Sequence, residues 1–221
     1  MLRLLVRLVL GLVLLSLLWV LAYRWFGPPV TFIMLRDRLA GVEVSHRPVP
    51  LEAISINLAR AVIAAEDANF CTHRGFDVDA IEKAMAANEA GGRLRGASTI
   101  SQQTAKNAFL WPGRTWLRKG LEAWFTVLIE GLWGKARIME VYLNIAEWGR
   151  GIYGAEAASR HYFGKPARDL TRAEAARLAA ILPQPIQRDA ASPGRFTRRY
   201  AATIQARMRV VANEGLDACV R

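Results

Sequence analysis

The chain has 221 residues, of which 52% are hydrophobic, and a formal net charge of +11 at pH 7. This length suits one domain with an appendage, and the apolar content suffices for a real core. Two cysteines, Cys71 and Cys219, make no disulfide framework, no His and Cys pair has metal-finger spacing, and the basic residues form no recognisable nucleic-acid-binding module. The sequence leaves open whether the two cysteines pair.

Residues 1–26 are predicted to form a transmembrane anchor. The stretch from Leu8 to Tyr23 is almost wholly Leu, Val and Trp, and with its apolar neighbours it reaches the roughly 20 residues that a bilayer span requires. Arg3 and Arg7 precede it and no acidic residue occurs before Asp37, which predicts a cytoplasmic amino terminus and export of the remainder. A cleaved signal peptide is the alternative, but the stretch is long for one and lacks a clear cleavage site, so we favour an uncleaved anchor.

The rest of the chain is predicted to be mostly α-helical. Residues 27–50 read as a connector with one short strand at 42–45, and residues 51–221 read as the functional domain. No alternation of period two lasts long enough to build a sheet. Helical spacing or start signals occur over residues 52–68, 77–90, 98–109, 115–133, 135–146, 151–162, 171–182 and 195–214.

Glu66 is the first candidate catalytic residue. It continues the apolar series of Ile56 and Ile63 along the helix predicted over 52–68, so its carboxyl should lie on the buried face. Burial raises the pKa of a carboxyl toward neutrality, as a general acid or base needs near pH 7. The alternative is a frayed helix end, with Glu66 turned to solvent or capped by His73.

A second candidate region follows the Gly-rich residues 91–96. Thr99 and Gln102 fit a capping box, which alone would explain both. Gln103, Lys106 and Asn107 lie at i, i+3 and i+4, so one helix face carries several hydrogen-bond donors near its amino terminus. Such a face could hold the oxygens of a phosphate or a sugar.

The segment from Arg114 to Trp133 combines cations, one acid and large aromatic residues. Glu122 follows Arg118 and Lys119 and is most simply their salt-bridge partner, although it could also hold a divalent cation or orient a phosphorylated substrate. The apolar stripe around Trp124 favours either a core helix or a helix in the membrane interface.

Taken in order, five blocks of the sequence resemble the peptidoglycan glycosyltransferases, specifically their monofunctional membrane-anchored members, over nearly all of residues 45–210. The blocks are Glu66-Asp67-x-x-Phe70-x-x-His73-x-Gly75; Gly96-x-Ser98-Thr99-Ile100-x-Gln102-Gln103-x-x-Lys106-Asn107; Arg118-Lys119-x-x-Glu122 with Leu128-Ile129-Glu130; Lys135 and Ile138-x-Glu140-x-Tyr142-x-Asn144 through Lys165; and Glu174-Ala175-Ala176-x-Leu178-Ala179.

This resemblance implies a lysozyme-like helical fold in two lobes and polymerisation of lipid II into β-1,4-linked glycan, with release of undecaprenyl pyrophosphate. Glu66 would be the base, with Asp67 supporting it, and Glu122 would position the pyrophosphate, directly or through Mg²⁺ or Mn²⁺. The substrate-binding and pyrophosphate-binding residues implied are Asp67, Ser98, Thr99, Gln103, Lys106, Asn107, Arg114, Arg118 and Lys119. The implied partners are lipid II, the nascent glycan strand, the bilayer of the cell inner membrane, and cell-wall synthesis or division proteins, with no nucleic acid.

Two other functions compete with this interpretation. A lysozyme-like hydrolase or lytic transglycosylase would also use one acidic catalyst, but it needs no pyrophosphate-binding cations. A membrane scaffold without activity would not need Glu66, Lys106 and Glu122 in the family positions. No Ser-x-x-Lys occurs, so no transpeptidase domain is expected.

Overall fold

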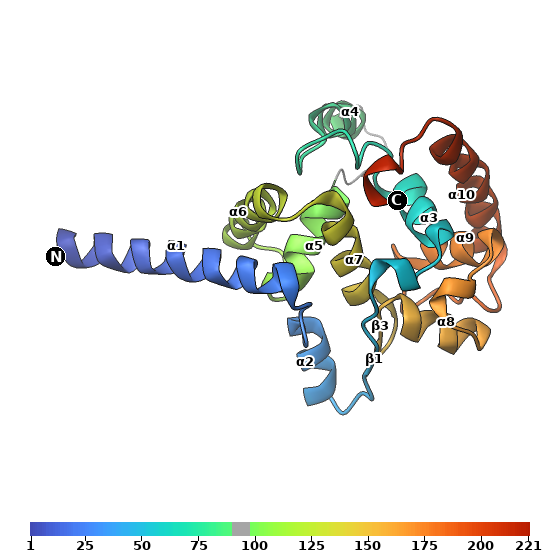
Figure 1. Cartoon of the computed structure of the whole chain (residues 1–221), viewed down its shortest axis with the longest axis horizontal. Coiled ribbons are helices and arrows are strands. Elements are labelled where there is room, and N and C mark those ends of the chain that lie inside the picture. Colours follow the sequence, from blue (N-terminus) through green and yellow to red (C-terminus); the bar gives the residue numbers. More distant parts are fainter. Residues whose placement is uncertain (90–97) are drawn as a thin grey trace.

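A computed structural model describes residues 1–89 and 98–221, so the Gly-rich segment 91–96 and Gly96 of the second block lie outside the described residues. The described chain is mostly α-helical, as predicted (Figure 1). Its helices are α1 (Leu2–Trp25), α2 (Phe32–Leu39), α3 (Ile56–Glu66), α4 (Val78–Glu89), α5 (Ile100–Phe109), α6 (Trp116–Leu132), α7 (Lys135–Ile145), α8 (Ala155–Phe163), α9 (Arg172–Ile181) and α10 (Arg195–Asn213), with 3-10 turns η1 (Leu51–Ala53), η2 (Ala167–Asp169) and η3 (Ala218–Val220).

The helices predicted in the functional domain correspond to α3 to α10, with differences of a few residues at their ends. Two parts of the prediction are wrong. Helix α2 lies inside the segment predicted to be a connector, and residues 151–154 precede α8 instead of beginning it. Those residues take part in a small sheet that the sequence pattern did not predict.

Three very short strands form this sheet in the order β1 (Ser45–His46), β3 (Ile152–Tyr153) and β2 (Glu147–Gly149), with β1 parallel and β2 antiparallel to β3. Gly151 turns the chain between β2 and β3 with a φ of +75°, and a Cβ there would lie 2.2 Å from the carbonyl oxygen of Glu43. Glycine is therefore required at this crossing. Through the pairing of β1 with β3, the sheet holds the connector of residues 27–50 against the domain.

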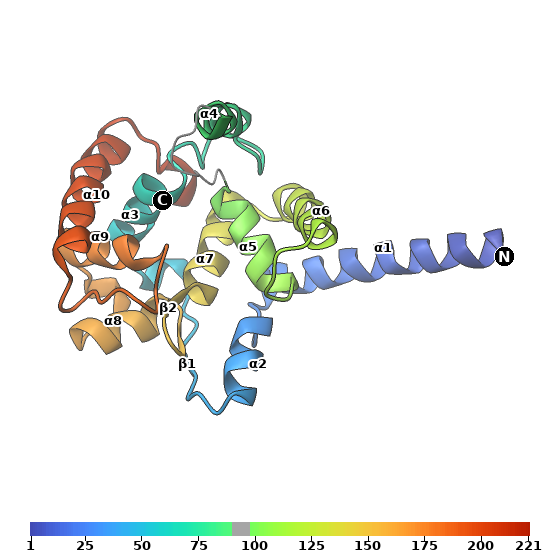
Figure 2. The same cartoon turned by 180° about the vertical axis from the view of Figure 1, so that it is seen from behind.

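The helices pack in two groups around one continuous core, as Figure 2 shows from behind. Helices α3, α9 and α10 pack on one another, and α5 packs on α6 and α7. Helix α7 also contacts α8, η1 and η3, so it joins the groups. The arrangement places the end of α3 beside the start of α5, where the candidate residues lie.

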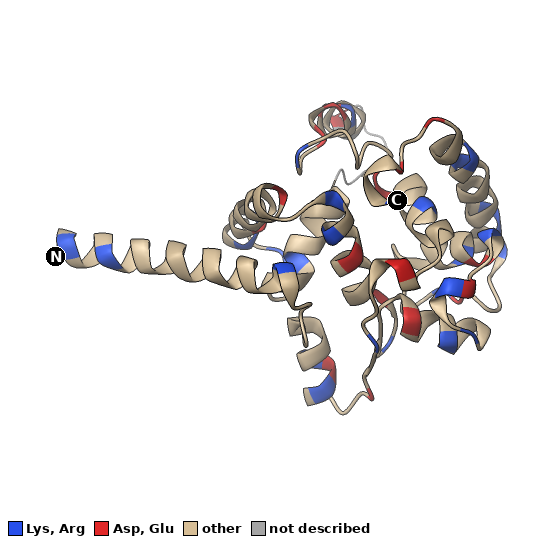
Figure 3. Ribbon diagram, viewed as in Figure 1, with Lys and Arg blue, Asp and Glu red and all other residues tan. Residues whose placement is uncertain are grey.

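Helix α1 projects from the domain and carries charged residues only near its two ends (Figures 1 and 3). It is long and apolar enough to cross a bilayer. Its carboxyl-terminal part packs on α6: the indole of Trp133 donates to the Val20 carbonyl at 2.9 Å, and Arg24 donates to the Leu132 carbonyl at 2.6 Å. The helix is thus attached to the domain by specific contacts as well as by the chain.

Cys71 and Cys219 form a disulfide, which settles the pairing that the sequence left open. Next to it, the buried carboxylate of Asp217 accepts a 2.7 Å bond from Arg60 of α3 and a 2.5 Å bond from Arg221. The carboxyl-terminal segment is therefore held both to α3 and to the loop that follows α3.

Candidate active site

Glu66 is the last residue of α3 and lies half-buried at the junction with α5. The side-chain Nε2 of Gln103 donates a 2.9 Å hydrogen bond to Glu66 Oε2. The carboxylate is thus held inside the molecule, and neither a frayed end nor a cap from His73 describes it. The prediction that the helical period places Glu66 on the core side is confirmed.

Asp67 ties the end of α3 to the start of α5. Its buried carboxylate accepts the backbone N–H of Ile100 at 2.9 Å and the Nε2 of His73 at 2.9 Å. The N–H of Gly75 points to His73 Nδ1 at 3.1 Å, which leaves Nε2 as the donor toward Asp67. Asp67 therefore fixes the position of Glu66 relative to α5, and its charge is already engaged by protein donors.

The predicted capping box at the start of α5 is present. The hydroxyl oxygen of Thr99 accepts the Gln102 N–H, and the Gln102 side chain accepts the Thr99 N–H. The Thr99 hydroxyl also donates to the carbonyl of Gly75 at 2.6 Å. Thr99 is 2% exposed and holds the start of the helix, whereas Ser98 is exposed.

A pocket of about 320 Å³ opens beside Glu66 and is the space into which a substrate hydroxyl could enter. Ser98 and Thr99, two of the predicted substrate-binding residues, lie on its wall. The sequence did not indicate that helix α4 supplies the opposite side. The residues that line the pocket are Glu66, Asp67, Ala68, Asn69, Asp77, Ala80, Lys83, Ala84, Ser98 and Thr99.

Tyr142 orients Gln103 and was not among the predicted site residues. Its hydroxyl donates to Gln103 Oε1 at 3.4 Å, which turns the Gln103 amino group toward Glu66. Burial raises the pKa of Tyr142 well above its ordinary value, so the hydroxyl stays protonated as a donor. The sequence could have indicated this role, because Tyr142 is surrounded by the apolar residues of α7 and a buried hydroxyl needs a hydrogen-bond partner.

Burial raises the pKa of the Glu66 carboxyl, and the neighbouring charge of Asp67 acts in the same direction. The hydrogen bond from Gln103 and the charge of Lys106 oppose this rise without cancelling it. A carboxylate in this setting binds a proton more readily than an exposed one. Glu66 is therefore suited to remove a proton from a substrate.

Cationic and amide side chains gather in a second pocket of about 230 Å³ at the other end of the α5 face. It is lined by Lys106, Asn107, Arg114 and Arg118, together with Ile33, Leu110, Trp111, Pro112 and Gly113. Within residues 1–89 and 98–221, the buried Nε of Arg118 has no hydrogen-bond partner. Three of the lining side chains, Lys106, Arg114 and Arg118, are cationic, so this pocket favours an anionic ligand.

Lys106 projects from α5 into this second pocket. Burial lowers the pKa of its ammonium group, while the nearby carboxylates of Glu122 and Glu66 favour the charged form. Glu66 contacts Gln103 of α5, and Lys106 belongs to the same helix, so α5 joins the two predicted groups.

Glu122 is 3% exposed and is the salt-bridge partner of two cations, as the simplest interpretation of the sequence held. Its Oε2 accepts from Arg118 Nη1 at 3.0 Å, and its Oε1 accepts from Lys119 Nζ. Both oxygens are therefore occupied, and the described residues contain no group of three or more acidic, His or Cys side chains able to hold a metal. With its carboxylate paired to Arg118 and Lys119, Glu122 does not fit a protein-held Mg²⁺ or Mn²⁺.

Helix α6 divides its apolar residues between the core and the surface. Phe125 and Ile129 are buried, whereas Trp116 is 92% exposed and Leu117 is 70% exposed. Neither the core nor the interface interpretation alone describes the helix. Its outer face leaves large apolar side chains uncovered close to the projecting helix α1.

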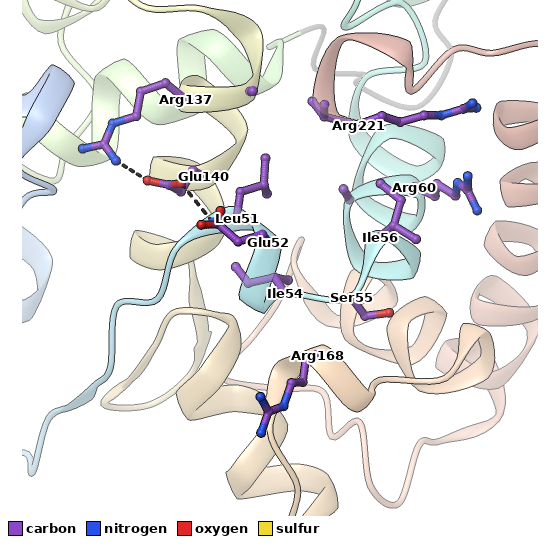
Figure 4. A pocket seen from close by; sticks show the side chains of 13 residues that line it. Leu51, Glu52, Ile54, Ser55, Ile56, Arg60, Arg137, Glu140, Arg168 and Arg221 are labelled. Carbon is purple, nitrogen blue, oxygen red and sulfur yellow. Dashed lines mark hydrogen bonds and ion pairs between the residues drawn. The ribbon is translucent and has the colours of Figure 1, made fainter.

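A larger cavity, of about 860 Å³, lies away from both pockets, between the start of α3 and the start of α7 (Figure 4). Its arginines mostly have acidic partners: Arg60 and Arg221 bind Asp217, and Arg137 binds Glu140. Cavity volume alone therefore does not identify the candidate site. We place that site at Glu66 and the cationic pocket, which α5 joins.

Comparison with known proteins gives a consistent result. The family model described as Transglycosylase matches residues 35–214. A biosynthetic peptidoglycan transglycosylase of Rhodospirillum centenum is 57% identical over 95% of this chain and 91% of its own length. Proteins of the same description are 55% identical in Caulobacter vibrioides, over 91% of this chain and 88% of theirs, and 52% identical in Pseudomonas aeruginosa, over 87% and 86%.

Proposed function

The chain belongs to the transglycosylase family and is a peptidoglycan glycosyltransferase, and on this premise we propose that Glu66 is the base with which it adds lipid II units to a glycan strand. The observation that carries the proposal is the link through Gln103 between Glu66 and the helix face that bears Lys106. Residues 51–221 would form the catalytic domain, residues 27–50 the connector and residues 1–26 the anchor.

In the proposed reaction, the 4-hydroxyl of an incoming lipid II attacks the anomeric carbon at the end of the growing strand. Glu66 takes the hydroxyl proton as the new C–O bond forms, and the bond from the anomeric carbon to the pyrophosphate oxygen breaks with its electron pair. An α-linked donor then gives a β-1,4 product by inversion. The products are the lengthened strand and undecaprenyl pyrophosphate.

The cationic pocket would receive the departing pyrophosphate. Lys106, Arg114 and Arg118 supply positive charge, and Asn107 can orient an oxygen. Fixed donors and cations of this kind stabilise negative charge that develops on a leaving group. Glu122 would not contact the pyrophosphate; its carboxylate would hold Arg118 and Lys119 in position.

The same proposal places α1 across the cell inner membrane, with the amino terminus in the cytoplasm and the catalytic domain outside. The basic residues before the span support an anchor, and the bonds from Trp133 to Val20 of α1 and from Arg24 of α1 to Leu132 support one that stays attached. A disulfide between Cys71 and Cys219 suits an oxidising compartment. The exposed Trp116 and Leu117 would meet the lipid surface.

A cleaving enzyme is the rival function, and the cationic pocket argues against it because glycan cleavage releases no pyrophosphate. The 221 residues contain no Ser-x-x-Lys, so we assign them no part in cross-linking the peptides.

The deciding experiment incubates labelled lipid II with the purified protein and separates the products on gels, with and without lysozyme digestion. We expect lysozyme-sensitive polymer from the parent protein and none from Glu66→Gln, which should still bind lipid. Polymer from a folded Glu66→Gln protein would exclude Glu66 as the base, and shortened glycan from added strands would support the cleaving enzyme.

A further inference from the structure

Helix α10 carries a row of exposed arginines, which Figure 3 shows along its length. The helix contains five arginines and no acidic residue. Within the described parts of the chain, none of the five forms an ion pair with a carboxylate. We call them the basic face of α10; they are Arg195, Arg198, Arg199, Arg207 and Arg209, and all five are exposed.

The charges of this face do not stabilise the helix that bears them. Arg195 and Arg199 are four residues apart, a spacing at which like charges on a helix repel. Arg195 and Arg198 lie within the first four residues, where the helix dipole disfavours a cation. The opposite side of α10 packs on the domain through buried residues such as Ile204 and Met208. Binding of an anionic partner therefore explains the arginines better than folding does.

The position of α10 argues against the bilayer as that partner. In both views of the molecule, α10 lies at the end of the domain opposite to the projecting helix α1 (Figures 1 and 2). Helix α1 is the expected membrane span, so α10 is directed away from the lipid surface. The basic face is thus accessible to a polyanion outside the membrane.

Helix α10 also lies beside the candidate active site. The Tyr200 hydroxyl donates to the carbonyl of Ala65 at 3.5 Å, and Ala65 directly precedes Glu66. One turn earlier, Phe196 is 60% exposed, and its ring centroid lies 6.2 Å from that of Tyr200. The guanidinium of Arg188 lies 4.9 Å over the Phe196 ring and is held by a 2.8 Å bond to a backbone carbonyl of α9. Aromatic and cationic side chains thus lead from Glu66 to the basic face.

A growing peptidoglycan strand carries groups that fit both kinds of side chain. Each disaccharide bears a short peptide with free carboxylates, so the strand is a polyanion whose charges recur at regular intervals. Carboxylates pair well with the planar guanidinium of arginine, and they are stronger hydrogen-bond acceptors than neutral groups. A strand that extends from Glu66 along α10 would bring successive peptides to successive arginines.

We propose that the basic face of α10 binds the peptide carboxylates of the growing glycan strand. This inference rests on the proposed function, because that function places the end of a strand at Glu66. A single exposed ion pair is weak, but several pairs on one strand reinforce one another, because each holds the next carboxylate near its arginine. The face would keep a strand close to the active site between additions without contacting the reacting atoms.

The test compares two forms of one ligand on the full-length protein in detergent. The probes are fluorescently labelled, uncross-linked glycan strands with intact peptides, and the same strands after an amidase has removed the peptides. Binding is measured by fluorescence anisotropy at low and at physiological salt. The α10 variant is Arg195→Gln/Arg199→Gln. The matched control is Arg38→Gln/Arg150→Gln, which removes two exposed arginines from α2 and from the turn between β2 and β3.

At low salt, the parent should bind intact strands about tenfold more tightly than stripped strands, through several weak ion pairs. The α10 variant should reduce this preference by about fivefold, as expected for the loss of two exposed pairs, and the control should keep it. Arg195→Lys/Arg199→Lys should retain most of the preference because the charge remains, and physiological salt should weaken it in every protein that shows it.

Two results on the strands would overturn the proposal: equal binding of intact and stripped strands by the parent, or an equal loss of preference in the α10 variant and the control. A third result would assign the basic face to lipid instead. That result is weaker binding of the α10 variant to phosphatidylglycerol vesicles, with its binding to intact strands unchanged.

The outcome is separable from that of the proposed function, because the probes are finished strands and the assay consumes no lipid II. Glu66→Gln should bind both probes like the parent, since Glu66 does not belong to the basic face. If the parent made no polymer but bound strands through their peptides and α10, the basic face would stand and the proposed function would fail. If polymer formed and the peptides had no effect on binding, the reverse would hold.

Discussion

Replacing Gln103 with leucine should move the acid limb of the pH profile of kcat/KM upward by about one unit. Gln103 Nε2 donates to Glu66 Oε2 at 2.9 Å, and this bond lowers the pKa of a carboxyl that burial raises. A hydrogen bond to a charged group contributes about 1.5–3 kcal/mol, and one pKa unit corresponds to about 1.4 kcal/mol. Because Glu66 is only half-buried, water replaces part of the lost bond, which favours the lower end of the range.

The sign follows from the base role: Glu66 must be deprotonated to act, so a higher pKa removes activity on the acidic side. At pH values below the midpoint of the parent's acid limb, Gln103→Leu should retain about a tenth of the parent's kcat/KM. Well above the midpoints of both proteins, Glu66 is ionised in each, so this difference should vanish. The assay measures initial rates with labelled lipid II across pH, with the exposed Gln187→Leu as control. This account of Glu66 would be refuted if the acid limb of the parent protein had its midpoint at the ordinary pKa of glutamate. It would also be refuted if Gln103→Leu did not move that midpoint.

Three further predictions concern Lys106, the disulfide and Glu66. Lys106→Ala should slow polymerisation far more than it lowers the melting temperature; equal losses would indicate a structural lysine. Replacing Cys71 and Cys219 by serine should lower the free energy of unfolding by about 5 kcal/mol in the chain-entropy view, given their separation of 148 residues. Urea titrations should then show no further effect of a reductant on that variant. Glu66→Gln should melt higher than the parent at pH 8, because a carboxyl whose folded pKa is raised destabilises the protein once ionised. This advantage should shrink as pH falls through the raised folded pKa of Glu66 and be lost below the ordinary glutamate value.

The parts of the site that follow helical spacing could be predicted from the sequence. The period of α3 placed Glu66 on the buried side, and the pattern Thr99-x-x-Gln102 predicted the capping box that begins α5. Both depend on residues less than four turns apart, where the geometry of an α-helix fixes relative positions. The salt-bridge interpretation of Glu122 succeeded for the same reason.

Features that depend on distant contacts could not be predicted in this way. The pairing of Cys71 with Cys219 and the bond from Tyr142 to Gln103 join residues 148 and 39 positions apart. Helix α2 was missed because it is only eight residues long and follows a Gly-Pro-Pro sequence; its buried Asp37 is held by the Tyr153 hydroxyl at 2.7 Å. Tertiary packing decides the structure of such short elements.

Helix α5 sets the distance between the proposed base and the leaving-group pocket. Gln103, which contacts Glu66, and Lys106, which lines the pocket, are three residues apart, a rise of about 4.5 Å on the same face. The register of this helix is fixed at its first turn, where the Thr99 capping box and the carboxylate of Asp67 occupy its backbone donors. An inverting transfer needs the base and the anion stabiliser on opposite sides of one carbon, so the proposed reaction requires the anomeric carbon to lie between Glu66 and Lys106.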